Sequence, residues 1–109
     1  MYKKKKILAI TLARGGSKGV KDKNIKSICG KPLIFYTIRE AKKSKYIDRY
    51  IVSTDSKKIQ TISKKYGAEA PFLRPKYLSS DTASSVAALK HTIKWTEKDA
   101  NIRYDIILE

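Results

Sequence analysis

The most informative stretch of the sequence is ILAITLARGGSKG, which runs from Ile7 to Gly19. Its first six residues, Ile7 to Leu12, form a short and nearly continuous apolar run, which is typical of a β-strand buried on both faces of a sheet. The residues from Ala13 to Asn24 are polar and include Gly15, Gly16 and Gly19. A buried strand that runs directly into such a loop indicates an α/β fold, in which ligands bind beyond the carboxyl ends of the strands.

Two helices and a second strand are predicted after this loop. Pro32 suits the first turn of a helix, where its missing N–H group costs nothing, and the apolar face of this helix comprises Ile34, Ile38 and Ala41. A strand is expected over residues 49–53. Asp55 or Ser56 then suits the N-cap of a second helix, which Gly67 ends.

The last third of the chain predicts another helix and another strand. Residues 71–75 read as an extended connection, and Asp81 or Thr82 is expected to cap the helix. Its buried face is expected to comprise Ala83, Val86, Leu89 and Ile93. Residues 104–108 predict a final buried strand. Strands that alternate with helices favour a three-layer α/β/α fold with a mostly parallel sheet, and residues 1–109 fit one such domain.

The charge of the chain favours anionic ligands. It has 25 Lys and Arg against 10 Asp and Glu, a net charge of +15, which raises the local concentration of nucleotides, polyphosphates and nucleic acids. Cys29 is the only cysteine, so an internal disulfide is impossible and a cytoplasmic location is expected. The apolar run after the N-terminal lysines breaks at Arg14, which argues against a signal peptide, and no stretch predicts a membrane span.

The loop after the first strand contains the residues needed to bind phosphates. Glycines let the backbone N–H groups approach an anion, while Arg14, Ser17 and Lys18 add charged and hydroxyl donors. Lys23 and Asn24 add another cation and an amide. The spacing matches neither the Walker P-loop nor the dinucleotide-binding fingerprint. A polyphosphate site is the favoured interpretation, and a solvent-exposed turn is the alternative.

These residues resemble the N-terminal signature of the acylneuraminate cytidylyltransferase family, the CMP-N-acetylneuraminate (CMP-sialic acid) synthetases. The resemblance rests on short blocks in a similar order and at a similar spacing, and it covers nearly the whole chain. The blocks are ARGGSKG at 13–19, followed by Lys23-Asn24 and GKPL at 30–33; VSTD at 52–55; LRP at 73–75; and SDTASS at 80–85. The resemblance implies the Rossmann-like fold of the nucleotide-diphospho-sugar transferases.

The resemblance also implies a reaction and a set of site residues. CMP would pass from CTP to the anomeric hydroxyl of a sialic-acid-like, nine-carbon keto-sugar acid, with Mg²⁺ assistance and release of pyrophosphate. Arg14 and Lys23 would be catalytic. The triphosphate would contact Arg14, Ser17, Lys18 and Lys23, and the ribose or cytosine would contact Asn24, Arg74 and Ser85, with Ala83 beside the base. The full set of nucleotide-binding residues is Arg14, Gly15, Gly16, Ser17, Lys18, Lys23, Asn24, Arg74, Ala83 and Ser85.

The resemblance covers only the N-terminal half of the family fold. The other half would supply the acceptor-sugar contacts, the acidic Mg²⁺ ligands and the segment that builds the family's homodimer. We therefore expect a truncated fold whose isolated chain retains the triphosphate loop but is inactive, and we expect neither nucleic acid nor a membrane as its partner.

Several alternatives remain open from the sequence. The net charge also suits a nucleic-acid-binding module, although the lysines are dispersed and no recognition motif is present. Legionaminic or pseudaminic acid could replace sialic acid as the acceptor, and a non-catalytic interaction protein would keep the fold alone. Arg74 could equally be a surface cation, and Asp55 is expected mainly to cap a helix. His91 lacks a partner cluster, and Trp95 is expected to anchor a helix to the sheet.

Overall fold

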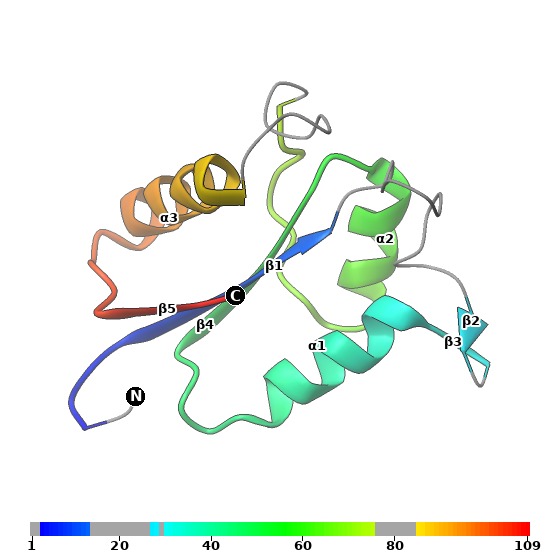
Figure 1. The fold of residues 1–109 in the computed structure, drawn as a ribbon, viewed down its shortest axis with the longest axis horizontal. Coiled ribbons are helices and arrows are strands. Elements are labelled where there is room, and N and C mark those ends of the chain that lie inside the picture. Colours follow the sequence, from blue (N-terminus) through cyan, green and yellow to red (C-terminus); the bar gives the residue numbers. More distant parts are fainter. Residues whose placement is uncertain (1–2, 14–26, 29, 76–84) are drawn as a thin grey trace.

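The computed structural model of the chain describes residues 3–13, 27–28, 30–75 and 85–109. Its elements follow in the order β1 (Ile7–Ala13), β2 (Ser27–Ile28), β3 (Lys31–Pro32), α1 (Leu33–Lys43), β4 (Arg49–Thr54), α2 (Lys57–Lys65), α3 (Ser85–Ala100) and β5 (Ile106–Leu108). The three predicted strands and three predicted helices are present (Figure 1). The sequence analysis does not predict β2 and β3, which pair antiparallel just before α1.

The main sheet is parallel and has β1 in the middle, in the order β4-β1-β5. The β1–β4 pairing runs from Leu8 opposite Arg49 to Ala13 opposite Thr54. The β1–β5 pairing places Ile7 opposite Ile106. The parallel arrangement is therefore confirmed. The strand β5 is shorter than predicted, because the N–H group of Tyr104 donates to the Glu97 carboxylate of α3 (2.9 Å) rather than joining the ladder.

The two faces of the sheet are covered by different helices, which gives the three expected layers (Figure 1). On one face, Ala13 and Val52 lie in a core with residues of α1 and α2, among them Ile34, Ile38 and Ile59. On the other face, Leu8, Ile10 and Ile51 pack against Leu89 and Ile93 of α3. The strands β1 and β4 are thus apolar on both faces, which is why their sequences form continuous apolar runs.

An irregular segment, residues 68–75, extends the sheet beyond β4. The Val52 N–H donates to the Glu69 carbonyl and the Arg74 N–H donates to the Thr54 carbonyl, both at 2.8 Å. The predicted extended connection is therefore confirmed over 71–75, and it also pairs with β4. The Phe72 ring contacts the Trp95 ring of α3, with centroids 5.3 Å apart, which confirms Trp95 as an anchor between helix and sheet.

The start of α2 corrects one expectation about capping. Ser56, rather than Asp55, is the N-cap, and its Oγ accepts a hydrogen bond from the Ile59 N–H at 3.2 Å. Asp55 lies one position too early to reach the orphan N–H groups of the first turn. The end of α2 is as predicted, because Gly67 follows the helix with a φ of 88°, a conformation that favours glycine.

The buried face of α3 differs from the predicted one. Val86 is 59% exposed, whereas Ala88, Thr92 and Thr96 are buried. Each threonine hydroxyl donates to the carbonyl four residues earlier, which satisfies it inside the core. The prediction is therefore confirmed for Leu89 and Ile93, which pack against the sheet. It is wrong for Val86, because small residues of α3 face the sheet instead. The predicted caps Asp81 and Thr82 and the predicted face residue Ala83 lie outside the described residues.

The part of the chain that the structure describes contains no helix that is both long enough and apolar enough to cross a membrane.

The capping role of Ser56 gives a direct test of this fold. Ser56→Ala should lower the free energy of unfolding by about 1 kcal/mol, because an N–H group of α2 loses its acceptor. Ser56→Asp should restore most of that loss, since Asp is an equally good N-cap. Urea unfolding followed by circular dichroism measures both. Equal loss in the two variants would contradict the assignment.

Candidate functional site

The carboxyl edge of the sheet is the place where the topology favours a ligand site. From β1, the chain passes to β4 on one side and then crosses to β5 on the other side. Connections therefore diverge from β1, and ligands bind at such points in open α/β sheets. Ala13 and Thr54, the last residues of β1 and β4, are fully buried and lie opposite each other. The predicted phosphate loop leaves the sheet at this position.

Most of the predicted site residues lie outside the described residues. These are Arg14, Gly15, Gly16, Ser17, Lys18, Lys23, Asn24 and Ala83. Their assignment as catalytic or nucleotide-binding residues therefore stays a prediction. The structure describes Arg74, and it describes Ser85 as the first residue of α3.

The structure brings Arg74 to the carboxyl edge. Its N–H group donates to the carbonyl of Thr54, the last residue of β4, at 2.8 Å. Its side chain is 4% exposed, so it is not the surface cation that the sequence left as an alternative. Helix α3 follows the residues after Arg74 and leads back to the amino end of β5, so it begins on the same side of the sheet as this edge (Figure 1). Arg74 and the start of α3 therefore lie on the side where the phosphate loop begins.

His91 is a residue of this region that the sequence analysis did not select. Its ring meets the Phe72 ring edge to face, with centroids 5.0 Å apart. Burial lowers the pKa of its imidazole, and the positive charge of Arg74 lowers it further. Its Nδ1 is shielded from solvent and has no hydrogen-bond partner among the described residues. Only the tertiary path of residues 68–75 brings Arg74 close to His91, and no local pattern indicates this.

Ser53 of β4 is another buried polar side chain with no partner among the described residues. It is fully buried, and its Oγ forms no hydrogen bond within the part of the chain that the structure describes. Because side chains alternate along a strand, Ser53 shares the α3 face with Ile51. A buried hydroxyl without a partner is uncommon in proteins. Ser53 therefore adds a hydroxyl, opposite Leu12, to a face of the sheet that is otherwise apolar.

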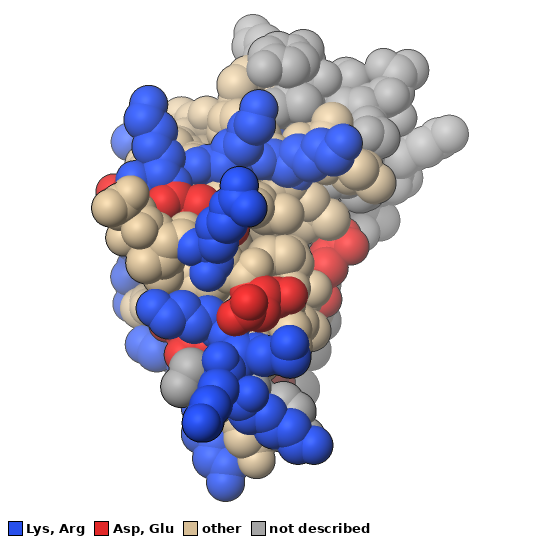
Figure 2. Space-filling model, turned by 90° about the vertical axis from the view of Figure 1, so that its left-hand side faces the viewer, with Lys and Arg blue, Asp and Glu red and all other residues tan. Residues whose placement is uncertain are grey.

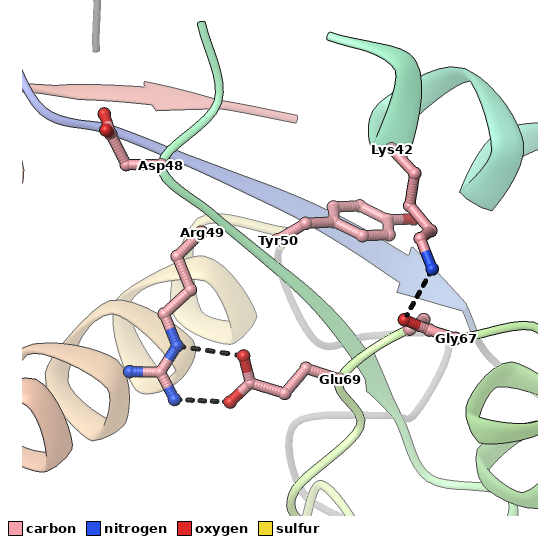
Figure 3. A pocket seen from close by; sticks show the side chains of 7 residues that line it. Lys42, Asp48, Arg49, Tyr50, Gly67 and Glu69 are labelled. Carbon is pink, nitrogen blue, oxygen red and sulfur yellow. Dashed lines mark hydrogen bonds and ion pairs between the residues drawn. The ribbon is translucent and has the colours of Figure 1, made fainter. Parts of the chain in front are cut away.

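The opposite edge of the sheet carries a groove of about 390 Å³, which is lined by residues including Lys42, Asp48, Arg49, Tyr50 and Glu69 (Figure 3). Its polar side chains already have partners elsewhere in the fold or in the groove itself. The Asp48 carboxylate accepts the Ile7 N–H at 2.7 Å, and this bond lowers the pKa of Asp48. The Tyr50 hydroxyl lies 2.6 Å from the Thr11 Oγ1. We interpret this groove as structural.

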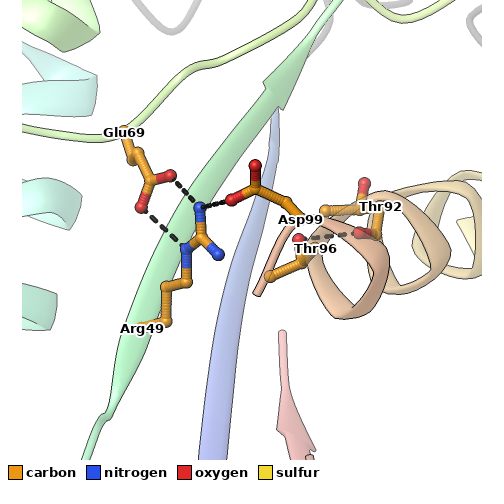
Figure 4. Close-up of polar contacts among 5 residues, drawn as sticks. All are labelled: Arg49, Glu69, Thr92, Thr96 and Asp99. Atoms are coloured by element: carbon orange, nitrogen blue, oxygen red, sulfur yellow. Dashed lines mark hydrogen bonds and ion pairs between the residues drawn. The ribbon is translucent and has the colours of Figure 1, made fainter. Parts of the chain in front are cut away.

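Arg49 connects three elements at that edge. Its guanidinium forms a two-point ion pair with Glu69 and reaches the Asp99 carboxylate of α3 at 2.9 Å (Figure 4). Hydrogen bonding to Glu69 raises the pKa of Arg49 above its ordinary value. The side chain is 19% exposed, and its guanidinium also lies over the Trp95 ring, 5.8 Å from the centroid. These ion pairs hold both the irregular segment 68–75 and helix α3 against β4.

Positive charge extends well beyond the carboxyl edge. Lys90, Lys94 and Lys98 are exposed at every fourth residue of α3. Figure 2 shows Lys and Arg side chains over much of the face on the α3 side, with Asp and Glu side chains among them. A field of this sign attracts anions to the whole molecule rather than selecting one of them.

The cytidylyltransferase family profile matches residues 8–104 of the chain. The chain belongs to this family. A pseudaminic acid cytidylyltransferase of Campylobacter jejuni is 46% identical over 100 residues, which are 92% of this chain and 43% of that protein. An N-acylneuraminate cytidylyltransferase of Escherichia coli is 44% identical over 88 residues, which are 81% of this chain and 21% of that protein. The chain thus spans less than half the length of these curated relatives.

Solved structures support the fold of this cytidylyltransferase family member. A CMP:2-keto-3-deoxy-manno-octonic acid synthetase, solved in complex with CTP, superposes with a TM-score of 0.74 at 22% identity. The superposition covers 94% of this chain and 38% of that one. The predicted α/β class is therefore confirmed, and the profile match over residues 8–104 confirms the family resemblance.

The assignment of the Arg49 cluster as structural is testable. Arg49→Ala should lower the free energy of unfolding by about 1–3 kcal/mol, because it removes charge-assisted hydrogen bonds to two carboxylates. Arg103→Ala, which removes an exposed cation, should change it by less than about 0.5 kcal/mol. Chemical unfolding followed by circular dichroism measures both. A smaller effect for Arg49→Ala than for Arg103→Ala would refute the assignment.

Proposed function

We propose that the chain forms the nucleotide-binding part of a cytidylyltransferase that transfers CMP from CTP to a nonulosonic acid and releases pyrophosphate. The observation that carries this proposal is the family match over residues 8–104, combined with the position of the ARGGSKG loop. That loop starts where the central strand β1 ends, at the edge where parallel sheets bind ligands.

The residues of the loop suit the phosphate chemistry. In the proposal, the anomeric hydroxyl oxygen of the sugar attacks the α-phosphorus of CTP, a new P–O bond forms, and the bond to pyrophosphate breaks. Arg14 and Lys23 would stabilise the negative charge that grows on the leaving pyrophosphate, and Ser17 and Lys18 would hold the triphosphate in line. The backbone N–H groups of the glycines would add donors that need no side chain.

Arg74 and the start of α3 would bind the other end of the nucleotide. The guanidinium of Arg74 offers planar donors to the ribose or the cytosine, as its place beside Thr54 allows. Asn24, Ala83 and Ser85 would complete this part of the site. The net charge of +15 would raise the local concentration of CTP without determining its specificity.

The acceptor in this proposal is a nine-carbon keto-sugar acid of the sialic acid type. Relatives that share this part of the fold are named for N-acylneuraminic, pseudaminic and N,N'-diacetyllegionaminic acids. The percentages of sequence identity do not separate the three groups of relatives. In this proposal the shared half carries the nucleotide loop, and the sugar contacts lie elsewhere. A pyrophosphate-release assay with each of the three acids, on a protein that includes the remaining half, tests which one reacts.

The cofactor, the assembly and the location belong to the same proposal. Mg²⁺ would accompany the triphosphate and screen its charge. The described residues contain no group of three or more His, Cys, Asp or Glu side chains that could hold a metal ion. We also propose a homodimer, formed through a segment outside this chain, and a cytoplasmic location, where CTP is available.

Calorimetric titration of the purified chain with CTP tests the proposal. We expect selective binding of CTP over ATP, GTP and UTP. Arg14→Ala should weaken it by about tenfold or more, since a charge-assisted hydrogen bond contributes about 1.5–3 kcal/mol. Lys64→Ala removes an exposed cation of α2 and serves as the control, with an expected change below about twofold. Absence of CTP binding by a folded chain would refute the proposal for this polypeptide.

A further inference from the structure

Helices α1 and α2 cover the face of the sheet opposite α3 (Figure 1), and a groove of about 320 Å³ lies between α1 and the end of α2. Its lining residues are Phe35, Ile38, Arg39, Lys42, Lys43 and Tyr66. Phe35, Arg39 and Lys42 are spaced four and three residues apart, so they form one stripe on α1. Tyr66, the C-cap of α2, packs against this stripe through the Phe35 ring, with centroids 4.9 Å apart.

The aromatic rings of this groove have cations over them. The Lys31 ammonium lies 5.5 Å from the centroid of the Phe35 ring and 6.0 Å from that of the Tyr66 ring. The Arg39 guanidinium lies 5.7 Å from the Phe35 centroid, and the Lys65 ammonium lies 5.7 Å from the Tyr66 centroid. Because an aromatic face attracts a cation without neutralising it, the rings position these side chains and leave their charge intact.

Little negative charge compensates the cations of the groove. The Glu40 carboxylate lies 3.7 Å from Arg39 Nε and 3.9 Å from Lys43 Nζ, and all three side chains are exposed, so these ion pairs are weak. Lys31 and Lys65 form no ion pair within the part of the chain that the structure describes, and both are exposed. The groove is therefore a local excess of positive charge around an apolar lining.

This arrangement favours carboxylates over nucleobases as ligands. A base binds a basic groove by stacking on an open aromatic face, but Phe35 and Tyr66 each have two cations over the ring already. The groove instead offers N–H donors around the apolar side chains of Phe35, Ile38 and Tyr66. Acidic side chains can bind such donors while an apolar side chain enters the groove, as amphipathic peptides do.

We propose that the groove between α1 and α2 is a docking site for an acidic, amphipathic peptide segment of a partner protein. Carboxylates of the segment bind Lys31, Arg39 and Lys65, and an apolar side chain packs beside Phe35 and Tyr66. A second copy of this chain is a poor occupant, because the net charge of +15 opposes self-association.

The groove lies apart from the proposed nucleotide site. Helix α2 follows β4, so it begins near the carboxyl edge of the sheet and ends, at Lys65, toward the opposite edge. Helix α1 leads to the amino end of β4, so its last residues, Lys42 and Lys43, also lie toward that opposite edge. Peptide docking therefore adds an interaction to the proposed function and leaves the carboxyl edge open for CTP.

NMR titration of the isotopically labelled chain at physiological salt tests the proposal. The probe is a synthetic peptide of glutamates and leucines in which the leucines, three and four positions apart, share one helix face. The control peptide has serine in place of each leucine. We expect chemical-shift changes grouped in residues 31–43 and 64–67. The serine peptide should bind about tenfold more weakly, because it lacks the apolar side chains that the groove buries.

Matched variants separate docking in the groove from attraction by net charge. Arg39→Gln and Lys31→Gln should each weaken binding of the leucine peptide by about three- to tenfold, because each removes a charge-assisted hydrogen bond. Arg103→Gln removes an equal charge from an exposed site that follows α3, and it should change the affinity by less than about twofold, since salt screens distant charges. Circular dichroism of each variant shows that the fold is retained.

Three results would overturn the proposal. Equal weakening by Arg39→Gln and Arg103→Gln would show that only the net charge matters. Equal affinity for the two peptides, or no binding of the leucine peptide, would show that the groove takes no apolar side chain. A single-stranded oligouridylate of the same net charge completes the comparison. If it bound more tightly than the leucine peptide and shifted the same residues, the groove would be a nucleic-acid site instead.

Discussion

The structure depends on the position of β1, which is paired on both sides and covered on both faces. Its backbone is hydrogen-bonded in parallel to β4 and β5, and its side chains alternate between the core beneath α1 and α2 and the core beneath α3. A strand enclosed in this way leaves only its two ends accessible. The loop that follows Ala13 therefore emerges at the centre of the carboxyl edge, where the glycines and cations of ARGGSKG suit a polyphosphate.

The two edges of the sheet differ in how their polar side chains are satisfied. At the amino edge, Arg49 forms ion pairs with Glu69 and Asp99. These pairs join β4 to the irregular segment 68–75 and to α3. At the carboxyl edge, buried polar atoms such as Ser53 Oγ and His91 Nδ1 lack partners among the described residues. Ser63 Oγ of α2 also lacks a partner among these residues, so an unsatisfied atom does not by itself mark a ligand site.

Much of the fold could be predicted because it depends on local patterns. The continuous apolar runs identify β1 and β4, and the four-residue spacing of Ile34 and Ile38 identifies the buried face of α1. The failures have tertiary causes. Val86 is apolar but exposed, because α3 turns its small residues Ala88, Thr92 and Thr96 toward the sheet. The pairing of the irregular segment 68–75 with β4 is tertiary, and no local pattern indicates it. His91 became part of the candidate site for the same reason, through Phe72 and Arg74.

The central claim is that CTP binds at the carboxyl edge, on the loop that leaves β1. Hydrogen–deuterium exchange of the chain, with and without saturating CTP and Mg²⁺, tests it most directly because it reports on every peptide at once. The account predicts slower exchange in peptides that cover Ala13 to Asn24, Arg74 and the first turn of α3. It also predicts unchanged exchange around Lys42, Asp48 and Gly67 at the opposite edge. Protection confined to that opposite edge, or no protection at saturating CTP, would contradict the account.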